Sequence, residues 1–239
     1  MRMEGLKQMD QSDVTARVSS YISKTLRDNF GKGPESVHTS INDMYITIYI
    51  RNFVSPTEKV LLTQRNQSVV EETRDLVMST LIPEIKANLL QLTGMSVDKF
   101  FYDWSLHNKS AMFTCISSED TKSDIPLRND YKGKEGVEKE VIHLSKVAQR
   151  VPDELKSFLL NNRTLLIIRN GILVNIEKQL IRDGYQETLK LAKRKLEKKL
   201  LHNNSYFDQH LETRVVDIFV DWDFDDDKSV ILFILNPTK

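Results

Sequence analysis

A repeat that runs through most of the chain limits its possible folds more than any other sequence feature. Ile50-Arg51-Asn52 returns as Ile168-Arg169-Asn170, and Asp103-Trp104 returns as Asp221-Trp222, each 118 residues further on (168 − 50 and 221 − 103). Two further pairs keep almost the same separation, 119 residues: Glu58-Lys59 with Glu177-Lys178, and Lys109-Ser110 with Lys228-Ser229. A register held over this distance predicts a duplicated module.

The repeat predicts two domains joined by a linker. Residues 1–118 form the first module and residues 137–239 the second. Residues 119–136 between them are rich in Ser, Asp, Lys and Gly and poor in apolar residues, which is typical of a linker. Because a tandem duplication resembles a fused homodimer, we expect a pseudo-dimer within one chain.

Hydrophobic periodicity predicts the elements of the first module. A helical pattern runs from Val14 to Phe30, with Asp10 or Ser12 as cap and Gly31 as its stop. Two strands, 37–41 and 46–50, alternate about a turn at Asn42-Asp43. Ser55-Pro56-Thr57-Glu58 resembles a capping box, and a long helical face from Val69 to Leu92 follows, with Pro83 expected to kink it. Strands at 96–106 and 111–117 complete the module.

The second copy repeats this order, so the predicted fold class is α+β, a tandem duplication of an α-β-β-α-β-β module. Its helices are expected at 138–149 and 175–201, and its hairpins at 155–168 and 213–235. Two alternating hairpins form a four-stranded antiparallel sheet with helices on one face. This order is a circular permutation of the ferredoxin-like plan.

Composition argues against several classes of protein. Lys plus Arg and Asp plus Glu each total 34, so no net charge attracts nucleic acid. A single cysteine, Cys115, rules out an intramolecular disulfide, and no signal peptide follows Met1, which together favour a reducing cytoplasm. No stretch approaches the ~20 apolar residues of a transmembrane segment, so any membrane association is expected to be peripheral.

Three charged or glycine-rich motifs have simple structural interpretations. Gly31-Lys32-Gly33-Pro34 could cradle a phosphate, but it follows a helix and lacks the Walker spacing, which favours a helix cap and turn. The aspartates of 221–227 lack the glycine and glutamate of a calcium loop, which favours a solvated hairpin turn. The basic run 190–199 is interrupted by Glu197 and carries leucines on its other face, which favours an amphipathic helix with a solvated basic side.

No catalytic or metal-binding constellation emerges from the remaining residues. The five histidines show no zinc-ligand spacing, so neither a metal nor a cofactor is expected. Cys115 alternates with Phe113 on a predicted strand and is interpreted as buried. Trp104 and Trp222 are expected to pack in the core or between modules. Arg51 and Arg169 could pair with Glu58 and Glu177, or with Asp103 and Asp221.

The first copy resembles a known bacterial family. The Gly31–Pro34 loop, the Ser55–Glu58 segment, Val70-Glu71-Glu72-Thr73-Arg74 and the 92–97 segment are similar to the signature of the MpsC-type domain, named for a sodium-translocating membrane-potential-generating system. The resemblance is clear over residues 10–118, whereas the second copy, over 137–239, lacks the glycine–lysine loop and has Lys193 in place of Arg74. It implies a cytosolic accessory protein of membrane subunits that act in inorganic-carbon uptake and membrane energisation, with no catalytic residues.

Two functional hypotheses follow. The first is a non-enzymatic cytoplasmic accessory or regulatory protein that docks on a protein partner, at the inner face of a membrane complex. The alternative is a sensor of a small anion or nucleotide, with Lys32, Arg51 and Arg74 as its ligand-binding residues. Neither hypothesis requires a catalytic residue, and an enzyme is the least favoured class.

Overall fold

The computed structural model describes residues 11–117 and 128–236, so residues 119–127 of the predicted linker and the candidate cap Asp10 lie outside it. Contacts group the described residues into two compact units. The first contains residues 11–100 and 109–117, and the second contains residues 101–108 and 128–236. The end of the first copy's third strand therefore belongs, by its contacts, with the second unit.

Each copy contributes its elements in the same order. The first copy contains α1 (Gln11–Phe30), β1 (Ser36–Asn42), β2 (Tyr45–Arg51), α2 (Pro56–Thr63), α3 (Gln67–Thr93), β3 (Val97–Ser105) and β4 (Ser110–Ser117). The second contains α4 (Lys134–Ala148), β5 (Glu154–Asn161), β6 (Thr164–Asn170), α5 (Asn175–Arg182), α6 (Gln186–His202), α7 (Tyr206–Leu211), β7 (Val215–Asp223) and β8 (Lys228–Leu235). Among these described elements, α7 has no counterpart in the first copy.

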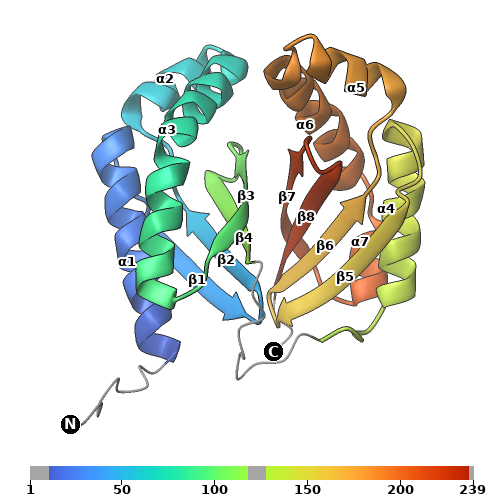
Figure 1. Cartoon of the computed structure of the whole chain (residues 1–239), viewed down its shortest axis with the longest axis horizontal. Helices are drawn as coiled ribbons and strands as arrows, with labels where there is room; N and C mark the ends of the chain where they lie inside the picture. The colour runs from blue at the N-terminus through green and yellow to red at the C-terminus, as the bar shows by residue number, and fades with distance from the viewer. Residues whose placement is uncertain (1–10, 118–127, 237–239) are drawn as a thin grey trace, which may run out of the picture. The chain divides into compact units, whose positions relative to one another are not determined.

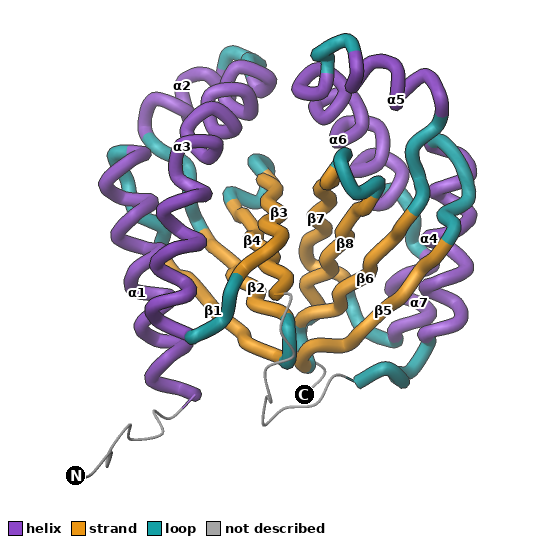
Figure 2. The backbone as a smooth tube through the Cα atoms, viewed as in Figure 1, coloured by secondary structure: helices purple, strands orange, loops and turns teal. Residues whose placement is uncertain are grey.

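The strands form two antiparallel sheets of equivalent topology. Their orders are β1-β2-β4-β3 and β5-β6-β8-β7, so the third strand of each copy lies at a sheet edge. Figure 1 shows the helices of each copy on one face of its sheet, and Figure 2 shows the same layering in the backbone trace. The predicted fold class is therefore confirmed. Trp104 on β3 and Trp222 on β7 occupy equivalent strands and are both buried, as expected.

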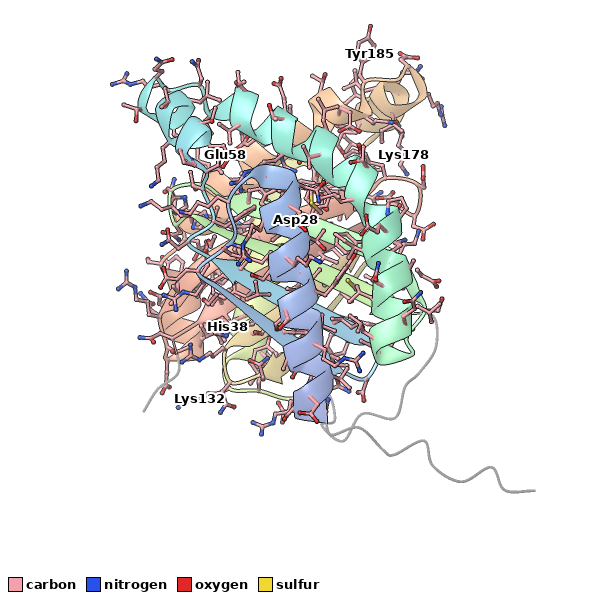
Figure 3. All side chains as sticks on the ribbon, turned by 90° about the vertical axis from the view of Figure 1, so that its left-hand side faces the viewer. Asp28, His38, Glu58, Lys132, Lys178 and Tyr185 are labelled. Atoms are coloured by element: carbon pink, nitrogen blue, oxygen red, sulfur yellow. The ribbon has the colours of Figure 1, made fainter. Side chains whose placement is uncertain are left out.

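Local signals position most of the first copy's elements correctly. The β1–β2 hairpin pairs Ile41 with Ile46. Gly31 has a φ of +69°, a left-handed conformation that glycine adopts without strain, and α1 ends immediately before it. The predicted helix stop at Gly31 is thus confirmed. Pro83 lies inside α3, and Figures 1 and 3 show this helix changing direction along its length.

Helix boundaries account for most of the errors in the prediction. The helix expected at 175–201 is two helices, because Asp183-Gly184-Tyr185 separates α5 from α6 and Gly184 has a φ of +83°. The first copy is divided in the same way between α2 and α3. Helix α4 begins at Lys134 rather than at residue 138, inside the predicted linker. Polar turn residues and a residue with positive φ end a helix locally even where the apolar pattern continues beyond them.

Candidate functional site

The guanidinium of Arg74, on α3, is completely buried in the first unit. Its Nε donates to Glu58 Oε1 at 2.7 Å and its Nη2 donates to Glu58 Oε2 at 2.9 Å, a two-pronged ion pair. Nη2 also donates to the carbonyl of Phe53 at 2.8 Å, and the cation lies 4.8 Å from the centre of the Phe53 ring. Arg74 therefore joins α3 to the loop that leads into α2.

Glu58, which lies at the start of α2 (Figure 3), caps this helix in addition to pairing with Arg74. Its Oε2 accepts from the backbone N–H of Ser55 at 2.7 Å, and its own N–H donates to Ser55 Oγ at 3.3 Å, which confirms the predicted capping box. Burial alone would raise the pKa of the Glu58 carboxyl, but hydrogen bonds from Arg74 and its positive charge outweigh that effect and lower the pKa.

The three residues predicted to bind a ligand lie in different surroundings. Lys32 Nζ donates to the carbonyl of Val54 at 3.3 Å, next to the Phe53 carbonyl that Arg74 holds. Arg51 is exposed at the end of β2. Within the described part of the first unit, no ion pair or side-chain hydrogen bond joins Arg51 to either of the others. The structure therefore brings Lys32 and Arg74 to adjacent carbonyls and leaves Arg51 apart.

The second unit repeats the buried cation with different chemistry. Lys193 on α6 replaces Arg74, and its Nζ lies 2.8 Å from Oε1 of Glu177, the equivalent of Glu58. Gln149 Oε1 also accepts from this ammonium group. Glu177 Oε2 accepts from the N–H of Val174 at 2.9 Å, so half of the capping box persists although the cap residue lacks a hydroxyl. The pairing of a buried cation with a capping glutamate is thus common to both copies.

Arg169 is the centre of a second buried cluster, which lies between β6 and α6. Its Nη2 donates to Glu197 Oε2 at 2.6 Å, and both side chains are almost fully enclosed. The hydroxyls of Ser229 and Ser145 accept from Nε and Nη1 at 2.8 and 2.9 Å. A cavity of about 10 Å³ adjoins this cluster, roughly the space of one water molecule.

These contacts correct the predicted ion pairs. Arg169 forms its ion pair with Glu197 instead of Glu177 or Asp221. Glu58 forms its ion pair with Arg74 instead of Arg51. Sequence reasoning missed Glu197, Ser145 and Ser229. Two signals were available: Glu197 is an acidic residue inside a basic run, and Ser229 belongs to one of the repeated pairs.

Two equivalent aspartates make matching contacts within the second unit. Asp103 Oδ2 accepts from the N–H of Val220 at 2.9 Å, and Asp221 Oδ2 accepts from the N–H of Tyr102 at 2.8 Å. Each carboxylate also meets a cation of α6: Lys198 Nζ lies 2.8 Å from Asp103 Oδ2, and Lys190 Nζ lies 2.8 Å from Asp221 Oδ1. Both carboxylates thus satisfy backbone donors of edge strands.

The predicted solvated basic face of α6 is only partly present, because Lys195 and Lys199 are exposed but other cations of the run are not. Lys193 and Arg194 are buried, and Arg194 Nε lies 3.2 Å from Asp103 Oδ1. Leu196, which was placed on the opposite, apolar stripe, is 46% exposed. Arg194 and Lys198 can face inward because the buried carboxylate of Asp103, more than 90 residues away in sequence, neutralises their charges.

The aspartate-rich segment makes hydrogen bonds to its own turn and to the loop that follows β6. Asp223 Oδ1 accepts from the N–H groups of Asp225 and Asp226, at 3.1 Å each. Asp227 Oδ1 accepts from the N–H groups of Ile172 and Leu173, at 2.8 Å each. This matches the predicted hairpin turn, although Asp221 itself is buried on β7.

Cys115 is fully buried on β4, as predicted, and burial raises the pKa of its thiol. A raised pKa keeps the thiol protonated, which disfavours a role as a nucleophile.

Comparison with known proteins identifies the family. A profile described as "Na+-translocating membrane potential-generating system (MpsC)" matches residues 10–119 and again residues 138–237. The chain belongs to the MpsC family. Both halves match, so the second MpsC segment has kept the family pattern despite its different buried cation. Neither a curated protein nor a solved structure matches the chain. In residues 11–117 and 128–236, no helix combines the length and apolar character needed to cross a membrane.

Proposed function

We propose that this MpsC protein is a non-enzymatic, cytoplasmic accessory protein that docks on the membrane components of a Na⁺-translocating, potential-generating system. The observation that carries the proposal is the match of both halves to a family named for such a system. The buried charges support it, because Arg74, Lys193 and Arg169 are each held by carboxylates of the same unit. These cations stabilise a scaffold, and the exposed surface is left for a partner. Inorganic-carbon uptake is the physiological process that we assign to the complex.

A sedimentation experiment tests the docking. Purified chain is mixed with inverted membrane vesicles from cells that produce the family's membrane subunits, and with matched vesicles that lack them. We expect the chain to sediment only with the first. A voltage-sensitive dye then reports the Na⁺-dependent potential, which should rise and saturate at a fixed ratio of chain to membrane subunit, as expected for a bound subunit. Equal sedimentation with both vesicle types would contradict the proposal.

Anion or nucleotide sensing in the first unit is the second proposal. The favouring observation is that, among the residues the structure describes, the ammonium group of Lys32 is held by a single carbonyl contact, 3.3 Å from Val54 O, so an anion could draw it away at little cost. The thermal midpoint is measured with phosphate, bicarbonate or ATP, for the natural chain and for Lys32→Ala. A stabilisation that Lys32→Ala abolishes supports sensing, and identical responses of the two proteins reject it.

A further inference from the structure

Two histidine rings meet where the β3–β4 turn reaches the end of α6. His107 lies in that turn and His202 is the last residue of α6, and both are exposed. Their ring centroids are 5.5 Å apart with an angle of 83° between the planes. Two imidazoles that bind one tetrahedral ion through nitrogens at about 2.0–2.1 Å place their centroids about 5 Å apart. The observed spacing therefore allows both rings to reach the same ion.

The ring nitrogens distinguish a ligand site from simple ring packing. His107 Nδ1 lies 3.4 Å from Ser105 Oγ, a contact that orients the ring and leaves Nε2 for another partner. Within the described part of the chain, neither ring nitrogen of His202 makes a hydrogen bond. Simple packing of two rings does not require a ring nitrogen without a hydrogen bond, whereas coordination of a metal ion requires one such nitrogen on each ring.

The surrounding charges permit a cation at this place. Lys198 lies one turn before His202, but its ammonium group is held by Asp103 Oδ2 at 2.8 Å and by the carbonyl of Trp104 at 2.5 Å. Asp217, almost fully buried on β7, and Asp103 both act electrostatically on the His202 ring as negative charges. Negative as well as positive charges therefore surround the two rings.

We propose that His107 and His202 form a surface site for one divalent transition-metal ion that favours imidazole, such as Zn²⁺ or Ni²⁺. In the described residues no cluster of three or more His, Cys, Asp and Glu side chains is arranged to hold a metal. Water therefore completes the coordination shell, as in sites that keep an open position. The bound ion ties the β3–β4 turn to the C-terminal end of α6.

Zinc binding by the full, tag-free chain tests the proposal, with a chromophoric chelator as competitor. We expect one ion per chain. His107→Gln and His202→Gln should each weaken binding by at least about tenfold, since losing a ligand costs no less than losing a group that orients one. The matched control is His38→Gln/His143→Gln, which removes two exposed histidines elsewhere and should leave the affinity unchanged.

Hydrogen exchange adds a readout that is independent of affinity. Zn²⁺ should slow amide exchange in peptides that cover residues 105–110 and 199–204, and it should do so in the control variant but in neither ligand variant. The proposal is overturned if the natural chain binds Zn²⁺ no better than the His107→Gln/His202→Gln double variant. It is also overturned if either single ligand variant binds like the natural chain.

Discussion

The buried pair of Arg74 and Glu58 gives the sharpest prediction, because the chain contains its own comparison. Arg74→Met removes the cation and leaves the Glu58 carboxylate, whose side chain is only 13% exposed, without its partner. Breaking an enclosed pair by removing one member costs about 3–5 kcal/mol. Lys193 holds Glu177 at the equivalent position of the second unit, so Arg74→Lys should keep one ion pair and lose the second hydrogen bond. We expect that variant to lose about 1.5–3 kcal/mol.

A double-mutant cycle separates the pair from the packing. Arg74→Met/Glu58→Gln leaves no uncompensated charge, so we expect it to be less destabilised than the sum of the two single variants, by an interaction energy of about 1–3 kcal/mol. Arg51→Met serves as the control, since its exposed side chain should change stability by less than about 0.5 kcal/mol.

Hydrogen exchange of the α2–α3 peptides is the appropriate assay, because two compact units can unfold separately and a global midpoint would average them. A loss of 3 kcal/mol corresponds to about a hundredfold decrease in the protection of the slowest amides. If Arg74→Met changes protection in Pro56–Thr93 by no more than Arg51→Met does, the pair does not stabilise this helix junction and the reasoning is refuted.

Three further predictions concern the same network and its neighbours. Arg74 lowers the pKa of Glu58 below its ordinary value of 4.5, so this carboxylate contributes stability above about pH 4.5 that is lost as the pH falls through the lowered pKa. Urea titrations between pH 3 and 7 should therefore show a weaker acid dependence of stability in Glu58→Gln than in the natural chain. An unchanged dependence would contradict the assignment. Asp103→Asn leaves Arg194 and Lys198 without their carboxylate and should cost about 3–5 kcal/mol in tryptophan-monitored unfolding, whereas the exposed Asp130→Asn should cost almost nothing. Ser55→Ala removes the hydroxyl cap of α2 and should cost about 1 kcal/mol, seen as faster exchange in Pro56–Thr63 alone; a loss spread over the whole unit would show that Ser55 acts otherwise.

Local chemistry explains which parts of the fold and of the site could be predicted. The Ser55–Glu58 capping box and the stop at Gly31 depend on neighbours within a few residues, and both are present in the structure. Arg74 was predicted to bind a ligand, and in the structure its guanidinium lies in a buried ion pair with Glu58. Its partner Glu58 lies 16 residues earlier in the chain. The pair therefore depends on how the intervening segment folds, which local sequence patterns do not show.

The contacts of Arg169 and of α6 could not be predicted for the same reason. The partners of Arg169 come from three elements: Ser145 from α4, Glu197 from α6 and Ser229 from β8. They contact Arg169 only when these elements pack together. Lysines at helical spacing are normally solvated, because burying a charge without a partner is costly. A lysine is buried only where an oppositely charged partner compensates its charge. Here the partners are carboxylates contributed by other elements.

The sequence by itself determined the duplication, the order of helices and strands within each copy and the two equivalent sheets, since these depend on periodicity and on short-range turn and cap chemistry. The tertiary structure alone decided which side of α6 faces inward and which carboxylate each buried cation binds. The physical reason is that the hydrophobic period depends on the order of residues along the chain, whereas the energy of a buried charge depends on groups that only folding brings within about 3–4 Å.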